Sequence, residues 1–103
     1  MDRSDPRSRT PDVRSTLRPG KPGMPFIYVY ILNDRTGRHH YVGVTDDLKD
    51  RLGRHNRGEV IHTSKHRPWK MQSVVAFDSL QKATAFERYL KSHAGREWAK
   101  RHL

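Results

Sequence analysis

Three side chains have types and spacing suited to chemistry on a phosphate group. Arg51 and His55 are four residues apart in a segment with helical periodicity, so they lie on one helix face. An arginine can hold phosphate oxygens with its planar fork, and a histidine can donate to phosphate or shuttle a proton. Glu87 lies in a later helical segment, where a carboxylate can bind a hard divalent cation. From residue types alone, an ion pair between Glu87 and Lys91 is the favoured explanation of that glutamate.

A second set of residues suits contact with a polyanion. A basic loop with one aromatic residue can grip backbone phosphates and stack on a base. Its aromatic residue, Trp69, can instead pack as a lid on the core, which is the favoured role. The candidates for nucleic-acid binding are Arg54, Lys65, Arg67, Trp69, Lys70 and Lys91.

The other histidines give no metal-binding pattern. His39 and His40 are adjacent on a predicted strand and point to opposite faces, so they make a poor metal pair. No ligand spacing connects the remaining four, which are His62, His66, His93 and His102. The chain has no cysteine, which excludes disulfides and thiolate metal sites.

Length and charge limit the class of protein. A chain of 103 residues holds one domain, and with 33% hydrophobic residues its core is small. No apolar stretch is long enough to span a bilayer. Lys and Arg number 21 against 11 Asp and Glu, a formal charge of +10. This excess favours nucleic acid or another polyanion as the partner over a surface that is basic by chance.

Hydrophobic patterning predicts the order β-β-α-β-α-α. Residues 26–32 form a nearly continuous apolar run, typical of a strand covered on both faces. A turn over residues 33–37 leads to a second strand at 40–44, and a third is expected at 71–77. We therefore expect an α+β fold, with a small three-stranded antiparallel sheet flanked by helices.

Capping residues predict where the helices begin and end. Thr45 is expected to cap the first helix, which residues 56–58 end. Ser79 is expected to cap the second helix and Gly95 to end it. A short final helix carries Trp98.

The first 25 residues have a different composition from the rest. They are rich in Arg, Ser, Pro, Asp and Gly, and we expect a disordered basic tail before a domain at residues 26–103. Six basic and three acidic residues lie in this tail, which leaves fifteen basic and eight acidic residues in the domain. The expected domain is therefore basic in its own right.

The order of these motifs resembles the GIY-YIG endonuclease superfamily. Tyr28-Val29-Tyr30 stands at the first triplet, with Tyr28 in place of glycine, and Tyr41-Val42-Gly43 stands at the second. Arg51 follows Tyr41 by ten positions and His55 by fourteen, as in the family. The resemblance covers residues 26–103. The chain looks most like the small stand-alone bacterial members, which share Arg67-Pro68-Trp69 and Gly95-Arg96-x-Trp98.

The resemblance implies a catalytic site and a metal. By similarity, Tyr30 or Tyr41 activates or positions the attacking water, Arg51 stabilises the phosphate, and His55 belongs to the same site. Glu87 corresponds to the metal-binding glutamate and would hold Mg²⁺ or Mn²⁺. The implied fold is the GIY-YIG nuclease fold.

The resulting hypothesis is a metal-dependent endonuclease acting on nucleic acid. DNA is the expected substrate, recognised by structure rather than sequence, as in repair or recombination. We expect a cytoplasmic monomer, with no membrane contact and no protein partner implied. Two alternatives are a catalytically silent nucleic-acid-binding module and a basic domain that docks on an acidic protein through the Trp69 loop.

Overall fold

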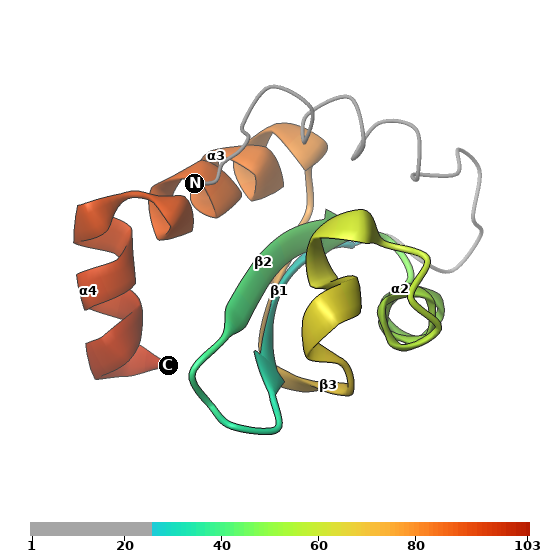
Figure 1. The fold of residues 1–103 in the computed structure, drawn as a ribbon. Coiled ribbons are helices and arrows are strands. Elements are labelled where there is room, and N and C mark those ends of the chain that lie inside the picture. Colours follow the sequence, from blue (N-terminus) through green and yellow to red (C-terminus); the bar gives the residue numbers. More distant parts are fainter. Residues whose placement is uncertain (1–25) are drawn as a thin grey trace.

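The computed structural model describes residues 26–103, which form a sheet with helices on both faces (Figure 1). The strands are β1 (Ile27–Asp34), β2 (His40–Thr45) and β3 (Trp69–Phe77). The helices are α2 (Leu48–Asn56), the 3₁₀ helix η1 (Ile61–His66), α3 (Leu80–Lys91) and α4 (His93–His102). This order confirms the predicted α+β arrangement. The predicted tail lies outside the described residues.

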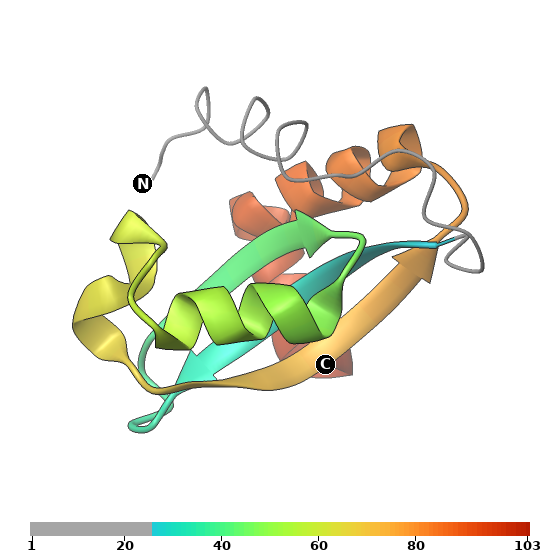
Figure 2. The same cartoon turned by 90° about the vertical axis from the view of Figure 1, so that its right-hand side faces the viewer.

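The sheet has β1 in the middle, with strand order β2-β1-β3 and antiparallel pairing on both sides (Figure 2). Its residues Val29, Tyr30, Ile31 and Leu32 are all buried. A strand covered on both faces needs an apolar side chain at nearly every position, which is why the run was continuous in the sequence. The prediction of a central first strand is confirmed.

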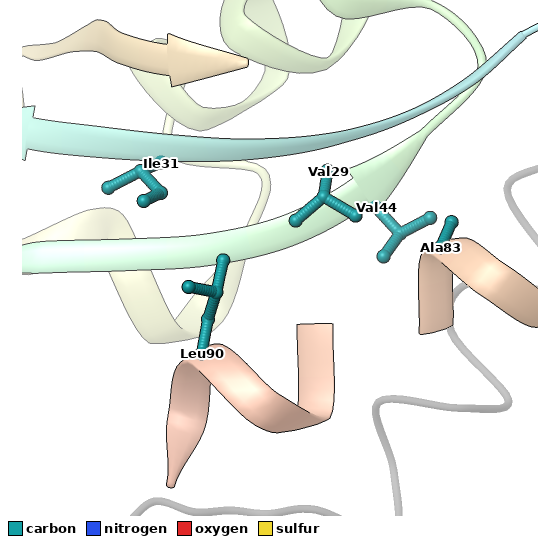
Figure 3. Packing of buried hydrophobic residues seen from close by; sticks show 5 residues of the cluster. All are labelled: Val29, Ile31, Val44, Ala83 and Leu90. Atoms are coloured by element: carbon teal, nitrogen blue, oxygen red, sulfur yellow. The ribbon is translucent and has the colours of Figure 1, made fainter. Parts of the chain in front are cut away.

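Two hydrophobic clusters lie on opposite faces of the sheet because successive strand side chains point to opposite sides. On the α3 face, Val29 and Ile31 join a cluster completed by Val44, Ala83 and Leu90 (Figure 3). Burying one such aliphatic side chain contributes about 1.5–3 kcal/mol. On the α2 face, the cluster contains Tyr30, Leu32 and Trp69, with Tyr41, Leu48, Leu52 and Met71 packed against it. This parity places Tyr30 under α2.

Two of the predicted helix boundaries are wrong. Asp47, not Thr45, caps α2: its side chain accepts from the backbone N–H of Asp50 at 3.0 Å, while Thr45 ends β2. Gly95 does not end α3 but lies buried in the first turn of α4. Its missing side chain allows close contact with the carbonyl of Tyr89 at the end of α3. The predicted cap Ser79 is confirmed, since it accepts from the N–H of Lys82 at 3.0 Å.

The loop before β3 contains structure that the sequence did not predict. It holds η1, and β3 begins at Trp69, two residues earlier than expected. The Trp69 side chain is 5% exposed, and its indole N–H donates to the carbonyl of Thr63 at 2.8 Å. The side chain of Asn56 at the end of α2 bonds both the N–H and the carbonyl of Trp69. These bonds fix η1 and the start of β3 against α2.

Within residues 26–103, no helix is both long and apolar enough to cross a membrane.

Candidate active site

Three rings from three elements meet on the α2 face of the sheet. Tyr30 comes from β1, Tyr41 from β2 and His55 from the last turn of α2. The ring centroids are 6.3 Å apart for Tyr30 and Tyr41, 5.8 Å for Tyr30 and His55, and 4.8 Å for Tyr41 and His55. Residues that are far apart in the sequence and were predicted to share a site therefore lie within one cluster.

Tyr30 is fully buried at the centre of this cluster. Its hydroxyl lies 2.9 Å from Nε2 of His55. Burial raises the pKa of Tyr30 well above its ordinary value of 10.0, and the neighbouring Tyr41 raises it further. The positive charge and hydrogen bonding of Arg51 only partly oppose this rise. Tyr30 is therefore a neutral phenol at physiological pH and acts as a hydrogen-bond donor.

The close approach of Tyr30 explains the glycine of the second triplet. Gly43 is the partner of Tyr30 in the pairing of β1 with β2. A Cβ at Gly43 would stand 2.5 Å from Cζ of Tyr30 and closer still to its hydroxyl. Only a residue without a side chain leaves room for the Tyr30 ring at this point.

His55 is held in one orientation by Thr63. Nδ1 of His55 lies 2.8 Å from Oγ1 of Thr63, whose hydroxyl donates to the carbonyl of Val60 at 3.3 Å. Because the Thr63 proton is used on Val60, its oxygen accepts from Nδ1–H of His55. Nε2 then carries the lone pair that accepts the Tyr30 hydroxyl. No sequence pattern pointed to Thr63, which is 1% exposed and eight residues from His55.

His55 stays neutral across the physiological range. Burial lowers its pKa from 6.5 to about 4, and the positive charges of Arg51 and Arg54 add to this effect. A neutral imidazole agrees with a ring that donates from one nitrogen and accepts at the other.

We expect this burial to make folding stability depend on pH. His55 takes up a proton near pH 6.5 in the unfolded chain but only near pH 4 in the folded chain. The free energy of unfolding is therefore highest above pH 6.5 and falls as the pH is lowered from 6.5 to 4. The loss should reach about 3 kcal/mol by pH 4. Urea unfolding of wild type and His55→Gln at several pH values tests this. An equal slope in both proteins between pH 6.5 and 4 would contradict the assignment.

Arg51 lies one turn before His55 on α2 and is 8% exposed. Its Nη2 is buried and has no hydrogen-bond partner among residues 26–103. Leaving a buried charged donor unpaired costs free energy, so this nitrogen is suited to an anion that arrives with the substrate.

Glu87 lies on α3 and is 5% exposed. Its Oε2 accepts a charge-assisted hydrogen bond from Nζ of Lys91 at 2.7 Å, so the helical ion pair considered from the sequence is present. Its negative charge also contributes to raising the pKa of Tyr30. The carboxylate is thus within electrostatic reach of the ring cluster.

The residues at Glu87 fit a hard divalent cation. Mg²⁺ and Mn²⁺ accept a single protein carboxylate with water in the remaining positions. A nearly buried carboxylate that already holds one cationic group, that of Lys91, provides such a ligand. A bound cation would compete with the ammonium of Lys91 for this carboxylate.

The candidates for nucleic-acid binding are divided by burial. Lys65, Arg67 and Lys70 are exposed around η1 and the start of β3, where they can contact phosphates. Arg54 is partly exposed and lies 3.5 Å from Glu59. The structure places Trp69 in the core, as the lid interpretation expected, so its ring is not available for stacking on a base.

The fold and this site define a class of catalytic domain. Residues 26–101 match the family model described as the GIY-YIG catalytic domain, and the chain therefore belongs to the GIY-YIG family. The family and fold expected from the sequence are confirmed.

Two curated relatives are similar to this chain in sequence. Both are described as structure-specific endonuclease subunit SLX1, from strains JEC21 / ATCC MYA-565 and B-3501A of Cryptococcus neoformans var. neoformans serotype D. Each is 39% identical over 83 residues, which covers 72% of this chain and 17% of the relative. These relatives are fungal, so they do not support the expected bacterial type. No solved structure matches the chain.

Proposed function

We propose that this domain is an endonuclease that hydrolyses phosphodiester bonds in nucleic acid, with DNA as the substrate. The observation that carries the proposal is the buried Nη2 of Arg51, which has no hydrogen-bond partner among the described residues, together with the Tyr30–His55 pair. A buried charged donor without a partner costs folding free energy, and a ligand that accepts its hydrogen bond removes this cost. Because the domain is basic, it attracts anions, and a phosphate oxygen can serve as this acceptor.

The two tyrosines have different parts in this proposal. Tyr30 is fully buried and its hydroxyl is committed to His55, so it orients the site. Tyr41 is only partly buried, and its ring lies against His55 at the edge of the cluster. Tyr41 is therefore the tyrosine that faces the attacking water and takes part in its activation. General-base help of this kind contributes about 10²- to 10⁴-fold in rate.

The remaining residues handle charge. Arg51 holds a phosphate oxygen and stabilises the charge that grows on it in the transition state. His55 accepts the Tyr30 hydroxyl and keeps that ring in place against Gly43. Mg²⁺ or Mn²⁺ bound at Glu87 would supply Lewis-acid polarisation of the phosphoryl group.

Structure-selective cutting is the favoured form of recognition. The two relatives are named as structure-specific endonuclease subunits, although the chain spans only 17% of their length. Exposed lysines and arginines near η1 contact phosphates and carry no sequence information.

We propose a cytoplasmic role in DNA repair or recombination. The monomeric state stays a prediction, because the name of the relatives describes a subunit.

One observation favours a second function, that of a silent nucleic-acid-binding module. Glu87 is paired with Lys91 at 2.7 Å and is satisfied without any metal. A binding module would keep this ion pair and the basic surface, and would never exchange the ammonium for a cation.

Cleavage of a panel of labelled nucleic acids separates the two functions. The panel holds duplex, single-stranded, flap and four-way-junction DNA and matching RNA forms, each with Mg²⁺ or Mn²⁺. We expect branched DNA to be cut, and Glu87→Gln to lower the rate at least about 100-fold while binding is kept. Glu97→Gln is the matched control, because Glu97 also pairs with a lysine, at 3.3 Å on α4. Tight binding without cutting by the wild type would establish the silent module.

A further inference from the structure

A second group of potential metal ligands, made of residues outside the ring cluster, lies at the end of β1 that leads into the β1–β2 turn. Asp34 ends β1, His39 lies in the turn before β2, and His66 ends η1. One ligand atom from each residue lies within 4.8 Å of the other two. Figure 2 shows the β1–β2 turn and η1 at the same end of the sheet. The residues are separated in sequence by up to 32 positions, so no short spacing motif predicts this group.

The carboxylate of Asp34 is already fixed in this group. Its Oδ1 accepts from the hydroxyl of Thr36 at 2.8 Å and from the N–H groups of Gly37 at 3.0 Å and His39 at 3.3 Å. Its Oδ2 lies 2.6 Å from Nδ1 of His39. Asp34 is 5% exposed, so the turn holds one carboxylate oxygen and presents the other to the histidine.

The second imidazole reaches the group from a different element. The rings of His39 and His66 are stacked, with centroids 3.7 Å apart and planes at 14°. Each ring has a nitrogen within reach of the Asp34 carboxylate, and neutral imidazole is the form that binds metals. An ion pair between Asp34 and His39 would explain two of the three residues but not the convergence of His66.

We propose that Asp34, His39 and His66 form a binding site for a borderline divalent transition metal, with Zn²⁺ as the expected ion. Two imidazole nitrogens and one carboxylate oxygen are a donor set that Zn²⁺ prefers and that Mg²⁺ does not. Water would complete the coordination. The His39 side chain is 45% exposed, so its ring has room to turn out of the stack and aim a nitrogen at the ion. Binding takes the coordinating nitrogen of His39 out of its contact with Asp34, and any proton on that nitrogen moves to the other ring nitrogen or to solvent.

Such an ion would join the β1–β2 turn to η1. That helix carries Thr63, which orients His55 in the ring cluster. The metal would therefore stabilise the segment that supports the candidate active site while remaining separate from Glu87. The proposal does not depend on the nuclease function, because it concerns only metal binding.

Zinc titration of the chelator-treated full chain tests the site. We expect one Zn²⁺ per chain by calorimetry, a rise in Tm with Zn²⁺, and a change in the NMR signals of His39 and His66. His39→Gln and His66→Gln should each weaken binding at least about 10-fold. His62→Gln, an exposed histidine of the same helix η1, and Glu87→Gln should bind Zn²⁺ like the wild type.

Three outcomes would overturn the proposal. One is no stoichiometric Zn²⁺ binding by a wild-type protein that is shown to be folded. Another is unchanged affinity in both His39→Gln and His66→Gln. The third is loss of binding in Glu87→Gln with retention in His66→Gln, which would place the ion at Glu87.

Discussion

Replacing Arg51 with lysine is expected to lower the cleavage rate about 10²- to 10³-fold and to leave substrate affinity nearly unchanged. The loss of one preorganised donor to a developing oxyanion has a cost of this size. Arg51 presents a planar guanidinium whose Nη2 is buried and has no partner among the described residues. A lysine keeps the positive charge, but its single ammonium cannot replace the two terminal nitrogens of the planar guanidinium. The effect should therefore fall on kcat more than on KM.

Single-turnover and steady-state kinetics on the best substrate of the panel measure this separation. Arg54→Lys is the matched control, because Arg54 is on the same helix, is partly exposed and lies near Glu59 at 3.5 Å. This change should alter the rate by less than a few fold and act mainly through affinity. A loss confined to KM in Arg51→Lys, or equal losses in both variants, would show that Arg51 only attracts the substrate.

The middle of the fold was predictable because its signals are local. The run from Phe26 to Leu32 needs cover on two faces, and this already identifies the central strand. Arg51 and His55 share a helix face by their spacing alone, and the structure buries both. The family resemblance added the meeting of Tyr30 with Tyr41, which the pairing of β1 with β2 brings about.

What the sequence could not provide depends on contacts between distant segments. The loop residue Thr63 decides which nitrogen of His55 carries the proton, and it belongs to a helix that no periodicity predicted. The difference between Tyr30 and Tyr41 is one of burial, since both are strand residues with the same chemistry. His39 was set aside because it points away from its neighbour His40, and His66 because it had no ligand spacing, yet the fold stacks their rings. Each of these features arises from contacts between segments that are distant in the sequence.

Gly43→Ala should inactivate the protein while only moderately destabilising it. The backbone of Gly43 has no need of a left-handed conformation, so the cost comes from the Tyr30 ring, which a Cβ would meet at 2.5 Å. Forcing a methyl group into a packed site typically costs about 1–3 kcal/mol, and here the ring must move away from His55. Gly53→Ala is the control: its Cβ would meet only the flexible end of Arg57, and alanine favours the helix by about 1 kcal/mol.

Urea unfolding and cleavage assays of both variants, with the double variant Gly43→Ala/Tyr30→Phe, measure the effect. If the ring is the cause, removing its hydroxyl relieves part of the destabilisation, and the double variant is more stable than the sum of the two changes predicts. Strict additivity, or full activity in Gly43→Ala, would mean that the Tyr30 ring can leave its place without consequence and that the Tyr30–His55 bond does not orient the site.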